Sequence, residues 1–352
     1  MRFDASVHAL PVESFHTPAG IRRTGTRTLN SMDKNSFRRL GNSGLAVSPT
    51  GLGCNNLGRR GAATEDLTGT QRVVSAAIDA GVTLFDVADV YGAPQGRSEE
   101  LLGAALGTRR ADVLIATKFG MNMNGANGPD FDARGSRRYL RKAVEASLRR
   151  LDTDWIDLYQ LHAPDPATPI AETLAALDEL VKEGKIRYLG HSNFAGWQLA
   201  DAAWTARDAG STPFISAQNE YSLLNRAVED ELLPAAAAFG VGVLPFYPLA
   251  NGLLTGKYRR DSQPADSRLS RFKPQLIESA PWDALEALAA FASARGITML
   301  ELTFGWLLAR PEVSSVIAGA TSAEQITANA AAAVAWQPST ADLAEIDTIF
   351  PR

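Results

Sequence analysis

Residues 84–106 read LFDVADVYGAPQGRSEELLGAAL, and this stretch holds the pattern from which the predicted fold is built. An apolar run stops at Asp86, Tyr91 follows five residues later, and a turn containing Gly and Pro leads into an amphipathic helix. A strand, a loop and a helix in this order form one βα unit. Because a hydrophobic core needs neither a carboxylate nor a phenol, a strand that delivers both to one end indicates a functional site.

The same unit recurs along the chain. Strands are predicted at residues 47–52, 83–86, 113–117, 156–161, 188–192, 214–218, 243–246 and 315–318. Helices are predicted near residues 70–80, 97–107, 140–151, 168–183, 196–209, 229–239, 299–310 and 323–334. In one helix, Leu140, Val144, Leu148 and Leu151 recur at spacings of four, four and three, which makes one apolar stripe. Strands that alternate with helices eight times predict an α/β fold of the (β/α)8 TIM barrel type.

Some segments fall outside these units. Residues 37–49 predict an N-terminal β-hairpin with its turn at residues 42–44, and residues 282–295 and 340–349 predict extra C-terminal helices. A doubly wound sheet is the competing architecture, and it requires a glycine-rich turn after the first strand. Residues 51–56 lack the third glycine of that turn and lead into a polar loop, so the barrel is favoured.

Composition restricts the classes of function. The chain has 352 residues, a formal net charge of −4 and a pI near 5.7, which argues against nonspecific binding to nucleic acid. No apolar run reaches the roughly 18 residues of a membrane span. Cys54 is the single cysteine, so an intrachain disulfide is excluded and a reducing, cytoplasmic location is predicted. With four histidines and one cysteine, no metal site is predicted.

The N-terminal residues differ from the rest of the chain. Residues 1–36 show no clear hydrophobic period and contain an arginine-rich patch. We predict a disordered extension at residues 1–36, followed by one barrel domain at residues 37–352.

Polar side chains end five successive predicted strands. These strand-end residues are Asp86, Lys118, His162, the pair Ser192 and Asn193, and Gln218. A single lysine or histidine at a strand end is usually a solvated or structural residue. Catalytic groups of a barrel, however, lie where its strands end, so this series predicts one site at the barrel mouth.

The residue types suit reduction of a carbonyl group. A tyrosine has an ordinary pKa of about 10, and a neighbouring ammonium group lowers that pKa because it favours the phenolate. Tyr91 can therefore act as the proton donor beside Lys118, with Asp86 keeping the lysine charged and His162 orienting the substrate oxygen. This set supplies an acid but no hydride, so a nicotinamide cofactor is implied.

The motifs FDVADVYG, ATKFG, DLYQLHAPD, GHSNF, QNEYSLLNR, PLANGLLTGKY and GATSAEQI resemble those of the aldo-keto reductases, in the same order, over about residues 37–350. The resemblance implies a (β/α)8 barrel that binds NADPH, with NADH possible, across its mouth. It implies an aldehyde or ketone as the small-molecule substrate. It also implies a catalytic tetrad of Asp86, Tyr91, Lys118 and His162.

The resemblance further implies a set of cofactor-binding residues. Ser192, Asn193 and Gln218 match positions that hold the nicotinamide amide, and Phe246 matches a ring that stacks on nicotinamide. Pro248, Leu249, Gly252 and Lys257 belong to the segment that runs over the pyrophosphate. Gly319, Thr321, Gln325 and Asn329 match the turn and helix that receive the adenosine 2′-phosphate and adenine, with Arg268 close to that phosphate. Tyr247 departs from the family pattern, which usually has a serine there.

Two other functions stay open at this point. Lys118 at a strand end also suits an aldolase that forms a Schiff base with its substrate. A non-catalytic, nicotinamide-binding regulatory subunit is the other alternative, since some relatives are cytoplasmic partners of potassium channels. Those relatives tend to have another residue at the position of His162, which favours the enzyme.

Overall fold

Eight parallel strands form the centre of the structure, a computed structural model that describes residues 37–264, 269–270 and 273–351. The strands are β3 (Thr50–Gly53), β4 (Leu84–Asp86), β5 (Leu114–Phe119), β6 (Ile156–Leu161), β7 (Ile186–Ser192), β8 (Phe214–Gln218), β9 (Gly242–Val243) and β10 (Val316–Gly319). Their order in the sheet is β10-β3-β4-β5-β6-β7-β8-β9, and every neighbouring pair is parallel. Each strand therefore pairs with the next one along the chain, as in a barrel.

Hydrogen bonds between the two outer strands close the sheet. The amide of Ser314 donates to the carbonyl of Val243 at 2.9 Å, and the amide of Ile317 donates to the carbonyl of Pro245 at 2.9 Å. Val243 and Val313 also form a parallel bridge. The predicted (β/α)8 barrel is thus confirmed.

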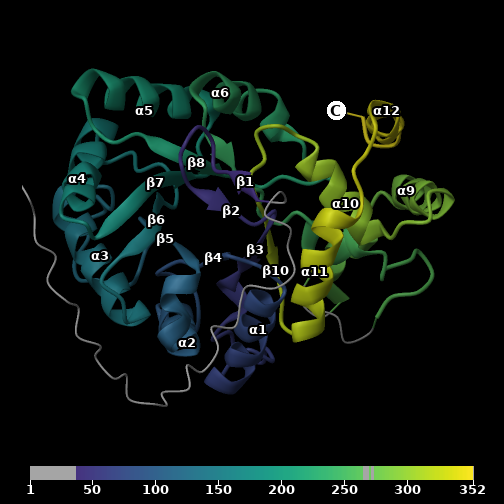
Figure 1. Ribbon diagram of the computed structural model, residues 1–352, viewed down its shortest axis with the longest axis horizontal. Helices are drawn as coiled ribbons and strands as arrows, with labels where there is room; N and C mark the ends of the chain where they lie inside the picture. Colours follow the sequence, from purple (N-terminus) through teal and green to yellow (C-terminus); the bar gives the residue numbers. More distant parts are fainter. Residues whose placement is uncertain (1–36, 265–268, 271–272, 352) are drawn as a thin grey trace, which may run out of the picture.

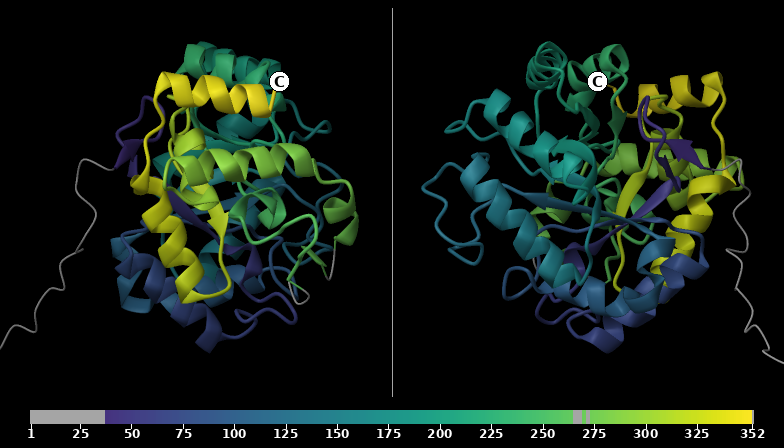
Figure 2. Two further views of the ribbon diagram at one scale, coloured as in Figure 1. Left: turned by 90° about the vertical axis from the view of Figure 1, so that its right-hand side faces the viewer. Right: turned by 60° about the vertical axis from the view of Figure 1, so that its left-hand side comes forward.

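Helices surround the strands (Figures 1 and 2). They are α1 (Leu67–Asp79), α2 (Arg97–Leu106), α3 (Arg137–Leu151), α4 (Ile170–Lys182), α5 (Gly196–Ala209), α6 (Leu232–Phe239), α8 (Pro274–Glu278), α9 (Trp282–Ala294), α10 (Met299–Leu308), α11 (Ala323–Ala335) and α12 (Thr340–Ile349). The predicted extra helices correspond to α9 and α12. Among the described residues no single helix is long and apolar enough to cross a membrane, and α9 with α10 passes that test only as a pair bent by 93°.

The predicted hairpin closes one end of the barrel. Strands β1 (Arg38–Arg39) and β2 (Ala46–Val47) pair antiparallel. Leu40 and Val47 of this hairpin pack against Leu84, Leu158 and other residues near the beginnings of the barrel strands. The opposite end, where the strands finish, is left for the site.

Two strands differ from their predicted bounds because of proline. The run predicted at residues 47–52 divides, and its first part belongs to the hairpin while the barrel strand begins at Thr50. Pro49 lies between the two parts and has no amide hydrogen to continue a ladder. Regular pairing of β9 likewise ends at Val243, two residues before Pro245, although the predicted strand reached residue 246.

His191 lies in the layer between the barrel and its helices. Its side chain is fully buried, and its ring stacks on Phe194 with 4.4 Å between ring centres and meets the edge of Phe214 at 5.3 Å. Burial lowers the pKa of His191 from 6.5 to about 3, because water is removed from the charged imidazolium. The imidazole is therefore neutral in the folded protein at neutral pH.

We expect His191 to make the fold sensitive to acid. The unfolded chain binds a proton below its pKa of 6.5 and the folded chain does not, so stability is full above pH 6.5 and falls toward pH 3. At pH 5.5 this difference costs about 1.4 kcal/mol. In urea unfolding between pH 5 and 7.5, His191→Leu should remove this part of the pH dependence. An unchanged slope would contradict the expectation.

Candidate active site

A buried ion pair joins the ends of two neighbouring strands. Lys118 of β5 places Nζ 2.8 Å from each carboxylate oxygen of Asp86, the last residue of β4, and 3.0 Å from the carbonyl oxygen of Val87. The lysine side chain is fully buried and that of Asp86 is 4% exposed. Because an ammonium group has three hydrogens, these contacts give each of them an acceptor.

Two amide side chains also donate to the Asp86 carboxylate. Nε2 of Gln218 lies 2.8 Å from Oδ1 of Asp86, and Nε2 of Gln160 lies 3.3 Å from the same oxygen. Gln218 was predicted to hold the nicotinamide amide, and that role stays a prediction. Gln160 was missed in the sequence, although it precedes His162 by two residues and so faces the same side of β6.

The structure brings Tyr91 and His162 next to this pair. Nζ of Lys118 lies 5.2 Å from the centre of the Tyr91 ring, and the rings of Tyr91 and His162 meet edge to face with 5.9 Å between centres. Tyr91 is partly exposed, whereas Lys118 is not. Of Tyr91 and Lys118, the tyrosine is thus the residue that a molecule at the mouth can reach.

Burial and the lysine charge act in opposite directions on Tyr91. Burial raises the pKa of Tyr91, the ammonium of Lys118 lowers it, and the charge of Asp86 raises it again, with a net increase. The contribution of Lys118 has the direction expected from the sequence, but burial outweighs it. Tyr91 therefore keeps its proton at neutral pH and is available as a donor.

Lys118 and His162 differ in charge at neutral pH. Burial by itself lowers the pKa of Lys118, but the Asp86 charge and hydrogen bonds leave it raised, so the amine stays protonated. Burial and the charge of Lys118 lower the pKa of His162 to about 3, so its imidazole is neutral at neutral pH. Nδ1 of His162 is buried and accepts or donates no hydrogen bond among the described residues.

Ser192 and Asn193 lie at the same mouth. Nδ2 of Asn193 donates to the carbonyl oxygen of His162 at 2.9 Å and to Oγ of Ser192 at 3.0 Å. The hydroxyl of Ser192 donates to the carbonyl oxygen of Gln218 at 2.8 Å. These bonds join the ends of β6, β7 and β8 beside the imidazole.

The segment after β9 passes close to Tyr91. The rings of Phe246 and Tyr247 meet edge to face with 5.3 Å between centres. The phenol of Tyr247 is among the groups that raise the pKa of Tyr91, which places it near the Tyr91 side chain. Pro248 and Leu249 follow in the same segment.

Gly252, further along the same segment, has a backbone conformation that L side chains rarely adopt. Gly252 has φ of 111°, and a Cβ atom there would lie 3.3 Å from the Tyr258 ring and 3.5 Å from the Lys257 side chain. Lys257 itself is exposed. Because Gly252 has no Cβ atom, another group can approach its backbone closely.

The last predicted group surrounds the beginning of α11. Gly319 of β10 is in register with Gly53 of β3, which is in register with Asp86, so Gly319 lies at the level of the mouth. The amide and hydroxyl of Thr321 donate to Oε1 of Gln325 at 2.8 and 3.1 Å. Asn329 is buried, and Arg268 lies outside the described residues.

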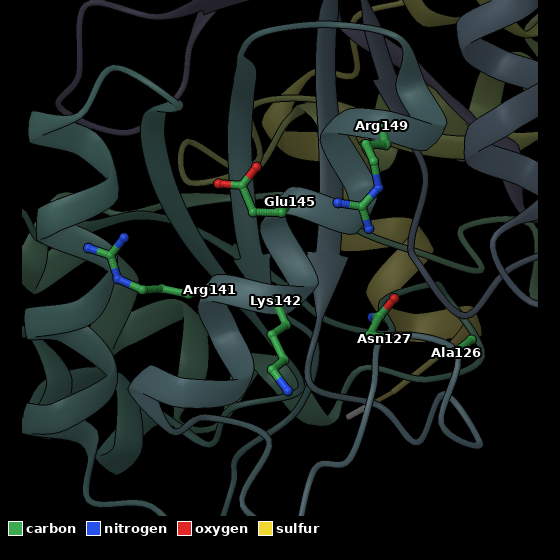
Figure 3. Close-up of a pocket in the computed structure, with 6 residues that line it drawn as sticks. All are labelled: Ala126, Asn127, Arg141, Lys142, Glu145 and Arg149. Atoms are coloured by element: carbon green, nitrogen blue, oxygen red, sulfur yellow. The ribbon is translucent and has the colours of Figure 1, made fainter.

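Other candidate sites receive no support. Cys54 is fully buried, and burial raises the pKa of its thiol, so it is not a nucleophile at neutral pH. No cluster of metal-ligating side chains occurs within the described part of the chain. A surface hollow beside α3 is lined by Ala126, Asn127, Arg141, Lys142, Glu145 and Arg149, none of which was a predicted site residue (Figure 3).

Known proteins are similar to this chain over most of its length. The profile of the Aldo/keto reductase family matches residues 49–350. A probable voltage-gated potassium channel subunit beta from Oryza sativa subsp. japonica is 37% identical over 83% of this chain and 89% of that protein. The L-glyceraldehyde 3-phosphate reductase of Escherichia coli (strain K12) is 35% identical over 88% of this chain and 91% of that protein. The chain therefore belongs to the aldo/keto reductase family of oxidoreductases.

Proposed function

We propose that the protein transfers hydride between NADPH and an aldehyde or ketone, with Tyr91 as the proton donor. The observation that carries this proposal is the convergence of Tyr91, Lys118, Asp86 and His162 at one mouth, with the lysine fully buried between the carboxylate and the phenol. The family supports oxidoreductase chemistry in general.

The electrostatics suit proton donation by Tyr91. At neutral pH the phenol is protonated because burial raises its pKa. As the proton leaves toward a substrate oxygen, negative charge develops on the phenol oxygen beside the ammonium of Lys118, which stabilises it. Asp86 keeps that ammonium charged in a buried position. In the reverse direction the phenolate accepts the proton of an alcohol.

His162 would orient the substrate rather than transfer a proton. Its low pKa keeps the ring neutral, so it adds no second positive charge beside Lys118. A neutral imidazole has one nitrogen that can donate a hydrogen bond to a carbonyl oxygen. Its edge-to-face contact with Tyr91 places both groups on one side of the mouth.

The residues present fit a nicotinamide dinucleotide. Bound NADPH would supply the hydride. The hydroxyl of Ser192 and the amide of Asn193 are positioned beside His162, where an amide group could bind. Gly252 leaves room for close approach of a pyrophosphate, and the exposed Lys257 offers positive charge next to it. Thr321 and Gln325 lie at the beginning of α11, where a phosphate is favoured.

The alternatives fit less well. A Schiff-base aldolase requires a neutral, accessible amine, whereas Lys118 is fully buried and its pKa is raised. A regulatory subunit is favoured by the names of relatives described as probable potassium channel beta subunits. His162 and the reachable phenol of Tyr91 favour an enzyme, and steady-state turnover of an aldehyde separates the two. L-Glyceraldehyde 3-phosphate, named in one relative, is the first aldehyde to assay.

We expect Tyr91→Phe to reduce kcat for aldehyde reduction by at least about 100-fold, the range for a lost general acid. The Kd for NADPH, measured by quenching of protein fluorescence, should stay nearly unchanged. Tyr188→Phe is the matched control, because Tyr188 packs at the hairpin end of the barrel. Equal turnover in Tyr91→Phe and the parent would reject the role of Tyr91.

We expect Arg268→Ala to weaken NADPH binding selectively. A hydrogen bond to a charged group contributes about 1.5–3 kcal/mol, so the Kd for NADPH should rise by roughly tenfold or more. The Kd for NADH, which lacks the 2′-phosphate, should not change. Arg259→Ala, at an arginine that precedes Arg268 in the same stretch of sequence, serves as a control for loss of a positive charge. Parallel weakening of both cofactors would contradict a role at the phosphate.

A further inference from the structure

A second polar cluster lies behind the candidate tetrad, between the barrel and its helices. Side chains alternate along β5, so Lys118 points into the barrel and Thr117 points outward. The hydroxyl of Thr117 donates to Oε1 of Glu99 in α2 at 2.6 Å. Both side chains are fully buried. Glu99 lies in the first turn of α2, at the positive end of that helix.

The cluster continues through α3 and the loop before it. Nε of Arg150 lies 2.7 Å from Oε2 of Glu99, and its Nη1 donates to Oδ1 of Asn127 at 3.0 Å. Nδ2 of Asn127 donates to Oδ2 of Asp89 at 3.0 Å. Asn127 is buried at the edge of the surface hollow (Figure 3).

These contacts form a closed ring that returns to Lys118. The backbone amide of Asp89 donates to the carbonyl oxygen of Lys118 at 3.2 Å. Asp89 precedes Tyr91 by two residues, and the amide of Tyr91 donates to the carbonyl of Ala88 at 3.1 Å. The ring therefore ties the loop that carries Tyr91 to the strand that carries Lys118.

The charges of the ring are unbalanced when all groups are ionised. Glu99 and Asp89 are two fully buried carboxylates. Among the described residues the one cation that pairs with either of them is Arg150, whose side chain is 14% exposed and bonds to Glu99. Burial and the charge of Glu99 raise the pKa of Asp89 well above its usual range, although Arg150 and Asn127 lower it. Two further phenols face this cluster, Tyr139 and Tyr159, and both have raised pKa values. Burial and the charge of Glu99 thus favour the protonated form of Asp89.

Stability is a weak explanation for such a cluster. A well-packed set of apolar side chains is often as stable as a buried ionic network, or more stable. Unlike apolar packing, the ring supplies directional hydrogen bonds between separate elements. It joins β5, α2 and α3 to the β4–α2 loop and to the loop that carries Asn127.

We propose that Thr117, Glu99, Arg150, Asn127 and Asp89 are positioning residues that hold the Tyr91 phenol at its distance from the Lys118 ammonium. This inference rests on the function proposed above. As positioning residues, these five side chains bond to one another rather than to the reacting groups. They act through the two ends of the ring, Lys118 and the loop before Tyr91.

Breaking the ring should impair catalysis without impairing cofactor binding. Thr117→Val and Asn127→Leu each remove ring hydrogen bonds and keep the number and branching of the side-chain heavy atoms. We expect kcat to fall roughly 10- to 100-fold, the scale of a misplacement near 1 Å, with the Kd for NADPH unchanged. Because Lys118 lowers the pKa of Tyr91, displacement should also move the basic limb of the pH profile of kcat/KM upward.

Position 89 provides a conservative rescue. Asp89→Asn keeps a side-chain oxygen that can accept from Asn127, so we expect kcat close to that of the parent. Asp89→Leu removes the acceptor and should behave like Asn127→Leu. Thr303→Val is the matched control for Thr117→Val, because Thr303 is equally buried but bonds to Met299 and Leu254.

A readout without turnover separates this inference from the proposed function. In protein labelled with ¹³C at tyrosine Cζ, the Tyr91 resonance is identified by its loss in Tyr91→Phe. The chemical shift of this resonance should change in Thr117→Val and Asn127→Leu and should be unchanged in Thr303→Val. If the parent reduces no carbonyl, the proposed function fails and this resonance alone decides the inference.

Two results would overturn the positioning role. One is a Tyr91 resonance, kcat and pH profile in Thr117→Val equal to those of the parent. The other is an Asp89→Asn variant as impaired as Asp89→Leu. Circular dichroism establishes that each variant is folded, and if Asn127→Leu is not, Thr117→Val decides, since it removes a single hydroxyl group.

Discussion

The ion pair between Lys118 and Asp86 is the interaction on which the rest of the site depends. Removing an ammonium group from water costs several kcal/mol, and this lysine is fully buried. The two carboxylate oxygens and the Val87 carbonyl offset that cost, and the amides of Gln160 and Gln218 satisfy the carboxylate further. Losing one partner of such a pair typically costs about 3–5 kcal/mol, because the other charge is then left alone.

Burial has opposite consequences for the groups around this pair. It raises the pKa of Tyr91 and lowers that of His162, so both are neutral at neutral pH, while Asp86 keeps Lys118 charged. One positive charge therefore faces a neutral phenol and a neutral imidazole. That combination of charges suits a reaction in which negative charge develops on oxygen. The combination itself depends on how far each group is removed from water.

Family membership and site chemistry answer different questions here. The relatives include proteins named as reductases and proteins named as probable potassium channel beta subunits, so membership by itself does not decide between catalysis and binding. The charges and contacts of Tyr91, Lys118 and His162 favour catalysis. The ring behind them, from Thr117 to Asp89, gives a reason why the phenol and the ammonium stay together.

Local patterns in the sequence determined the barrel and the residues at its strand ends. Side-chain periods of two and of about 3.6 depend on a few neighbouring residues, and the apolar stripe from Leu140 to Leu151 proved to be part of α3. Local effects of proline caused the errors at β3 and β9. Only the tertiary structure decided that Gln218 donates to Asp86, 132 residues earlier, and that Glu99 pairs with Arg150. It also decided the net direction of the Tyr91 pKa, because burial is a property of all the elements packed around a group.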